Sequence, residues 1–135
     1  MDSIFTAVRC NPQHTFIFLT KQPQNLPREF PDNCWVGVST PDASDAINAN
    51  KYMSRITAKV KFLSIEPMQY WRLFPETIEG IICGYQWIIF GCQTQPLRIP
   101  NNSDTYEIMN ACDKAGIPVF IKSPLSDIMN LKRQE

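Results

Sequence analysis

The fold of this chain is decided by the stretch Lys61-Phe62-Leu63-Ser64-Ile65-Glu66-Pro67. Its β-branched and aromatic residues form an apolar run of the kind that makes a buried strand. Proline has no amide hydrogen to donate to a neighbouring strand, so the strand must end before Pro67. We therefore expect a strand over residues 60–65, with Glu66 at its carboxyl end, where the chain leaves a sheet.

Four other apolar runs have the same character, and each leads into polar side chains. They are residues 15–20, 34–39, 86–91 and 117–121. Continuous apolar strands that alternate with helical patterns predict an α/β fold. The expected architecture is a parallel sheet of about five strands with flanking helices that cover at least one face.

The first two helices are predicted from capping residues and apolar spacing. Ser3 is expected to cap a short helix that ends at Asn11-Pro12. The sequence Thr40-Pro41-Asp42 is a typical helix start, with the Thr40 hydroxyl as the cap and proline in the first turn. Apolar residues then recur at helical spacing, interrupted by Asn50, and the helix is expected to end near Arg55.

The second half of the chain gives weaker helix signals. Asp104 and Glu107 form an acidic variant of a capping box, and Gly116 is a typical helix stop. Residues 126–131 are expected to form a last turn. Residues 68–82 indicate only short turns, near residues 71–74 and 79–81.

Composition excludes several classes of protein. The chain has 135 residues, 13 basic and 13 acidic, so its balance of charge does not favour a nucleic acid or a membrane surface as partner. No apolar run approaches the length of a membrane span, and the first residues lack the pattern of a secretory signal. The five cysteines show no ligand-type pair spacing. We expect reduced thiols, no bound metal and a cytoplasmic location.

The strand ends supply the candidate site, because ligands of parallel α/β folds bind at the carboxyl ends of the strands. The residues expected on the ligand side are Thr20, Lys21, Ser39, Ser64, Glu66, Cys92, Gln93 and Lys122. Glu66 with Lys122 is the strongest pair, although a Lys–Glu pair can also serve only structure. His14 precedes its strand and is expected to be structural, and Trp35, Trp87 and the strand phenylalanines are expected to be packing residues.

Five segments occur together in an order that is similar to one family. They are 14–23 (HTFIFLTKQP), 35–39 (WVGVS), 62–67 (FLSIEP), 87–91 (WIIFG) and 118–122 (PVFIK). The set resembles the C-terminal half of a phage-associated family of uncharacterised proteins with a barrel like that of radical S-adenosylmethionine enzymes. The resemblance covers about residues 4–122.

The resemblance implies an incomplete (β/α) barrel over residues 1–125, followed by a C-terminal turn and tail at 126–135. It implies an iron–sulfur cluster and S-adenosylmethionine only for a full-length member, because the cysteine cluster of the family has no counterpart in this chain. Two departures are evident. The family tends toward a Gly-Gly-Glu-Ser-Gly turn where this chain has 91–95 (GCQTQ), and Ser123-Pro124 replaces its usual continuation after Lys122.

Three functions remain open at this point. The first is a part of a radical-enzyme-like barrel that is not catalytic alone, completed by a missing N-terminal half. The second is a non-catalytic binding module that pairs with a partner or with itself through open sheet edges. The third is a small α/β enzyme in which Glu66 and Lys122 act as an acid–base pair.

Overall fold

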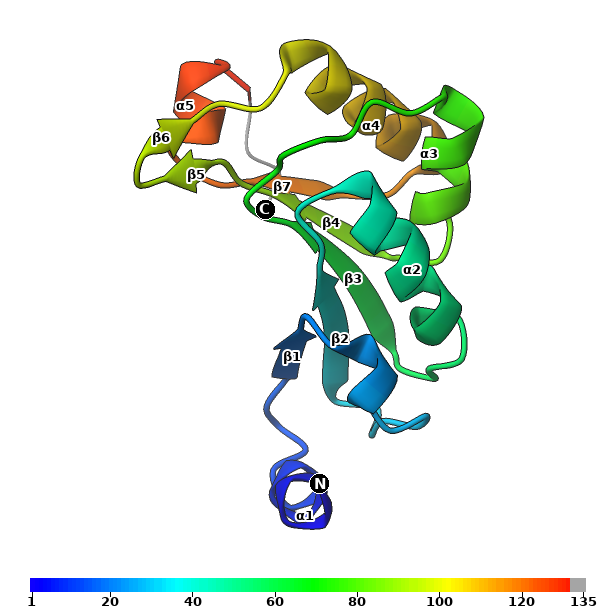
Figure 1. Cartoon of the computed structure of the whole chain (residues 1–135). Helices are drawn as coiled ribbons and strands as arrows, with labels where there is room; N and C mark the ends of the chain where they lie inside the picture. Colours follow the sequence, from blue (N-terminus) through cyan, green and yellow to red (C-terminus); the bar gives the residue numbers. More distant parts are fainter. Residues whose placement is uncertain (132–135) are drawn as a thin grey trace.

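The computed structural model describes residues 1–131, and a parallel five-stranded sheet runs through it (Figure 1). The order across the sheet is β1-β2-β3-β4-β7. The strands are β1 (Phe16–Thr20), β2 (Cys34–Ser39), β3 (Val60–Ile65), β4 (Trp87–Phe90) and β7 (Val119–Ile121). The α/β prediction is confirmed. In the described part of the chain β1 and β7 each pair with one strand, so the sheet is open and forms no closed barrel.

Helices alternate with the strands along the chain. They are α1 (Asp2–Cys10), α2 (Ala43–Met53), α3 (Pro75–Ile82), α4 (Asn102–Ala115) and α5 (Leu125–Ile128), with a 3-10 turn η1 (Pro23–Asn25). Figure 1 shows α2, α3 and α4 along one face of the sheet and a small hairpin beyond the carboxyl end of β4. The hairpin consists of β5 (Gln93–Thr94) and β6 (Leu97–Arg98).

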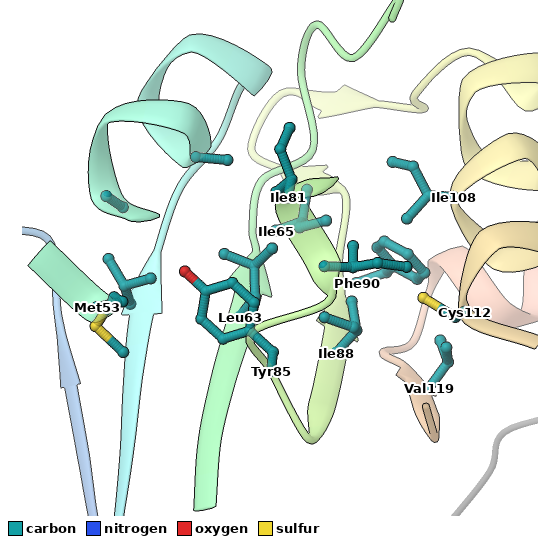
Figure 2. Close-up of a cluster of buried hydrophobic side chains, with 14 of the residues drawn as sticks. Met53, Leu63, Ile65, Ile81, Tyr85, Ile88, Phe90, Ile108, Cys112 and Val119 are labelled. Carbon is teal, nitrogen blue, oxygen red and sulfur yellow. The ribbon is translucent and has the colours of Figure 1, made fainter. Parts of the chain in front are cut away.

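The main core lies between the sheet and these helices (Figure 2). Side chains alternate along each strand, so Leu63 and Ile65 of β3 point to the helices while Phe62 and Ser64 point to the other face. Leu63 and Ile65 have no exposed surface. Their neighbours in the core include Met53 of α2, Ile81 of α3, Ile88 and Phe90 of β4, and Ile108 and Cys112 of α4.

The side chain of Asn50, on helix α2, is hydrogen-bonded to the Ile81 carbonyl and to Tyr85. The sequence places Asn50 as a polar break in an apolar face, and its amide donates to the Ile81 carbonyl at 2.9 Å. The Tyr85 hydroxyl donates to Asn50 Oδ1 at 2.7 Å. Burial raises the pKa of Tyr85 above its usual range, so the hydroxyl remains a neutral donor. Asn50 therefore ties α2 to α3 and to the entry of β4.

The start of α2 differs from the sequence prediction. Asp42 is the N-cap, and its carboxylate accepts from the Asp45 amide at 2.9 Å. The Thr40 hydroxyl is buried and has no partner among the described residues. Thr40 lies two residues too early to cap, because its amide instead donates to the Ser64 carbonyl and extends the sheet.

Other predictions about helix caps and helix faces also differ from the structure. Ser3 does not cap α1, which begins one residue earlier, at Asp2. Asn101 caps α4 by accepting from the Ser103 amide at 2.8 Å, so the proposed capping box is wrong and Asp104 lies in the first turn. Gly116 does end that helix, with φ of 67°, as predicted. Ile47, one of the apolar residues at helical spacing in α2, is 41% exposed.

Two elements are absent from the sequence prediction. The turns expected in residues 68–82 are instead a segment without regular structure at 68–74 followed by α3, which begins at Pro75. Gly80 inside that helix obscured its pattern, because glycine is a poor helix former. The hairpin was missed because each of its strands has only two residues.

The segment after β3 anchors the beginning of α2. The Gln69 amide donates to the Pro41 carbonyl, and the Ala43 amide donates to the Tyr70 carbonyl. Trp71 is fully buried, and its indole N–H donates to the Pro41 carbonyl at 3.1 Å. Among residues 1–131, no helix combines the length and the apolar character needed to cross a membrane.

Truncation of a core leucine tests the placement of β3. Leu63→Ala removes a fully buried side chain between the sheet and its helices and should lower the free energy of unfolding by about 2–5 kcal/mol. Leu97→Ala is the matched control, because Leu97 is 53% exposed, and should change it by less than about 0.5 kcal/mol. Urea unfolding measures both. Equal effects of the two substitutions would contradict the described burial.

Candidate functional site

The second face of the sheet carries a separate set of side chains, which we call the open face. Strand partners in register share a face, and Ile17 pairs with Trp35, Gly37 with Phe62, and Ile89 with Phe120. The open face comprises Ile17 and Leu19 of β1, Trp35 and Gly37 of β2, Phe62 and Ser64 of β3, Trp87 and Ile89 of β4, and Phe120 of β7. None of them belongs to the main core cluster.

Aromatic rings gather at the amino-terminal end of the open face. The Trp87 ring lies 5.9 Å from Trp35, 5.6 Å from Phe62 and 6.5 Å from Phe120, measured between centroids. The rings are tilted or perpendicular to one another, which is the favoured arrangement of aromatic pairs. Trp35 and Trp87 are only partly buried. The expectation that they are ordinary packing residues is therefore corrected, since they line a surface.

Gly37 allows Phe62 to lie flat on the sheet. A Cβ at position 37 would collide with the Phe62 ring. Phe62 is only 1% exposed although no described helix covers this face. The neighbouring Trp87 and the absence of a side chain on Gly37 together account for that burial.

The carboxyl end of the open face carries a polar group of side chains, which we call the rim: Ser39, Ser64, Glu66 and Lys122. Lys122 Nζ donates to Glu66 Oε2 at 2.6 Å, across the intervening strand β4. The side chains are 44% and 32% exposed, so the pair is within reach of a ligand. The sequence predicted this meeting, because carboxyl ends of parallel strands lie at one edge.

Gly91 gives Glu66 the space to cross β4. A Cβ at position 91 would lie 2.8 Å from Glu66 Oε1 and 2.9 Å from its Cδ. The main chain is fixed there as well, because the Gly91 amide donates to the Ile65 carbonyl and the Lys122 amide donates to the Phe90 carbonyl. Gly91 is therefore a positioning residue for the pair.

The two serines support the rim. Ser39 and Ser64 are partners in register, and Ser39 Oγ donates to the Glu66 carbonyl at 3.4 Å. Ser64 is 2% exposed. Because serine side chains are small, Ser39 and Ser64 leave open space on the sheet beside Glu66.

Thr20 and Lys21 lie apart from the Glu66–Lys122 pair. Thr20 Oγ1 accepts from the Gln22 amide at 3.0 Å and closes a local turn. Lys21 lines a cleft of about 230 Å³ between that turn and α2, together with Thr40, Asn48 and Tyr52. Ser39 of the rim also lines this cleft, whereas Glu66 and Lys122 do not.

Neither Cys92 nor Gln93 belongs to the rim. Cys92 is 6% exposed and its side chain packs in the main core. Gln93 begins the hairpin, and its side-chain Nε2 donates to the Gln95 carbonyl at 3.3 Å. His14 precedes β1 at the amino-terminal edge of the sheet, the end opposite to the rim, as expected.

The cysteines are dispersed. All five are free thiols; Cys10 and Cys83 are exposed, whereas Cys34, Cys92 and Cys112 are buried. Burial, with a smaller effect of Asp113, raises the pKa of Cys112 to about 12, and burial raises that of Cys34. Within residues 1–131 no three His, Cys, Asp or Glu side chains are grouped to hold a metal ion.

Three site features escaped the sequence prediction. They are the space that Gly37 gives to Phe62, the space that Gly91 gives to Glu66, and the partial exposure of Trp35 and Trp87. Apolar and aromatic spacing along a buried-type strand cannot say which face lacks helices. The glycines in strands 34–39 and 86–91 were a usable signal, because a glycine inside a strand marks close approach of another group.

Fold and rim together define an open parallel α/β protein with a polar site at the carboxyl ends of its strands. Comparison with family models matches residues 1–126 to the family described as protein of unknown function (DUF5131). The chain belongs to that family. No curated protein and no solved structure was found to match it.

Gly91→Ala tests how Glu66 is positioned. A double-mutant cycle with Glu66→Gln and Lys122→Met, measured by urea unfolding, should give a coupling free energy of roughly 0.5–1 kcal/mol in the natural chain. In the Gly91→Ala background the coupling should approach zero, because the new Cβ displaces the carboxylate.

Gly80→Ala is the matched control for this cycle. A Cβ at position 80 meets nothing within 4 Å, so the coupling between Glu66 and Lys122 should persist. Full coupling in the Gly91→Ala background would show that Glu66 does not need the space above Gly91.

Proposed function

We propose that this chain is the ligand-binding part of a phage-associated barrel protein of the radical S-adenosylmethionine type, and that it is not catalytic alone. The observation that carries the proposal is the open face with its rim. One face of the sheet is packed by helices, whereas the other has exposed apolar side chains that lead to a paired carboxylate and ammonium. Ligand sites of parallel α/β proteins lie at this end of the sheet.

The exposed edge of the sheet supports completion by further strands. Ile17 and Leu19 of β1 are 59% and 54% exposed on the open face. In the described part of the chain β1 has β2 as its one neighbour. A parallel strand added beside β1 would extend the sheet and cover apolar surface. The same features would serve a non-catalytic binding module, which remains the alternative.

The cysteines of this chain do not fit an iron–sulfur cluster. Cys34, Cys92 and Cys112 are buried and occupy separate strands, loops and helices, and no cysteine lies in a metal-binding group within residues 1–131. The raised pKa of Cys112 favours the thiol over the thiolate that ligates iron. The role proposed here therefore uses the chain's own rim and open face, with no step assigned to a cluster.

An acid–base role for the rim rests on the contact between Glu66 and Lys122. The 2.6 Å hydrogen bond and the partial exposure of both groups would allow proton transfer to a bound molecule. Such a role would make the chain active alone, which distinguishes it from the proposed function.

Anaerobic reconstitution with iron and sulfide tests the proposal. The isolated chain should bind no stoichiometric cluster, because its thiols are dispersed. Absorbance in the visible range and iron analysis measure the outcome. A cluster bound in proportion to protein would contradict the proposed function. Turnover by the cluster-free chain that disappears in Glu66→Gln would favour the acid–base alternative instead.

A further inference from the structure

The open face contains a groove of the size of a small-molecule site. Its volume is about 600 Å³, and its lining includes Trp35, Trp87, Ile89, Phe120 and Lys122. Sites for small ligands typically occupy roughly 300–1,000 Å³ and combine apolar walls with a few polar groups. The groove fits this description, because most of its lining residues are apolar and its polar ones are Gln86, just before β4, and Lys122 of the rim.

The shape of the groove follows from the order of side chains along β4. Trp87 stands at one end, Ile89 in the middle, and Gly91 follows the strand in register with Lys122. Four residues along a strand span about 13 Å, which is long enough for a bicyclic ring system between the indole and the rim. Phe62 and Phe120 lie on the strands to either side.

The aromatic rings favour a planar ligand. Trp87 contacts three other rings edge-on or at a tilt, and Trp35 and Trp87 remain only partly buried. Planar heteroaromatic rings stack on such side chains, and stacking contributes about 1–3 kcal/mol for each base in known complexes. The tilted rings alone would suit any apolar ligand. The chemical class of the ligand is therefore argued from the charged pair at the rim.

The rim presents a donor beside an acceptor. Lys122 lines the end of the groove, and its Nζ donates to Glu66 Oε2 at 2.6 Å, so the carboxylate lies directly beside the ammonium that the groove presents. A purely anionic group would be repelled by Glu66, and a purely cationic group by Lys122. A lactam edge satisfies both, because its ring N–H can donate to the carboxylate while its carbonyl accepts from the ammonium.

We propose that the groove binds a planar heteroaromatic ring with a lactam edge, of the guanine type, with that edge toward Glu66 and Lys122. Trp35 and Trp87 line the part of the groove away from the rim, and Gly91 leaves the space in which the acceptor lies. The inference rests on the proposed function because it uses the same face, and it adds the class of ligand. The exposed Ile17 and Leu19 side chains lie beyond the groove, on β1, and remain accessible to further strands.

Binding of guanosine to the isolated chain tests the inference. Calorimetry should show saturable binding, accompanied by a change in tryptophan fluorescence, since Trp35 and Trp87 line the groove. 1-Methylguanosine should bind roughly tenfold or more weakly, because methylation removes the ring N–H that donates to Glu66. Adenosine, which lacks a lactam, should also bind more weakly. These ligand comparisons need no change to the protein.

Substitutions then assign the contact. Glu66→Gln should weaken guanosine binding by roughly tenfold or more, because the charged acceptor is lost. Glu79→Gln is the matched control: Glu79 forms an exposed ion pair with Lys114 at 3.5 Å, on helices away from the open face, and its loss should leave the affinity unchanged.

The inference is overturned by any of three results. They are no saturable guanosine binding, equal affinity for guanosine and 1-methylguanosine or adenosine, and equal effects of Glu66→Gln and Glu79→Gln. Each result leaves the cluster-reconstitution test of the proposed function unaffected. Conversely, a bound cluster would contradict the proposed function without changing the affinity for guanosine, so the two failures are distinguishable.

Discussion

The hydrogen-bonded pairing of β3 with β2 and β4 is the constraint on which the rest of the structure depends. This pairing fixes the register of Phe62 against Gly37 and of Ser64 against Ser39. It also directs Leu63 and Ile65 to the helices, since neighbouring side chains of a strand face opposite ways. A shift of one residue would exchange the two faces and move both leucine and isoleucine out of the core.

The two faces of the sheet serve different purposes. On the helix side, Leu63, Ile88 and Ile108 are fully buried and supply apolar stabilisation. On the open face, glycines at positions 37 and 91 give space to a phenylalanine and a glutamate from β3. The result is a surface with aromatic rings at one end and an ion pair at the other. We infer that a ligand occupies the middle of this surface and that further strands meet it beside β1.

The sequence predicted those features that depend on the chain's local order. Strands 34–39 and 60–65 were predicted with the observed bounds, because long apolar runs between turn residues are clear signals. The approach of Glu66 to Lys122 was predicted as well, since both end strands of one parallel sheet. The surface character of Trp35 was not, because apolar spacing does not reveal which face lacks a helix. Cys92 followed a strand like the rim residues, yet its side chain turned into the core.

Local alternatives explain the remaining differences. Thr40 and Asp42 are both good capping residues. Asp42 is the cap because the Thr40 amide donates to the Ser64 carbonyl and so belongs to the sheet. Glycine at position 80 concealed α3, although Pro75 gave a valid start signal. Only the first case required knowledge of a partner distant in sequence, the Ser64 carbonyl.

The central claim is that the open face is a working surface of the protein. Sedimentation velocity over a wide range of concentration tests it most directly, using the natural chain, Leu19→Asp and Ile47→Asp. Leu19 is 54% exposed on the open face, whereas Ile47 is 41% exposed on α2. In the isolated chain a second copy is the partner that can supply strands beside β1. We therefore predict that the natural chain and Ile47→Asp associate as concentration rises, and that Leu19→Asp remains monomeric because a charge on β1 opposes burial. A natural chain that stays monomeric, or equal association by all three proteins, would contradict the account.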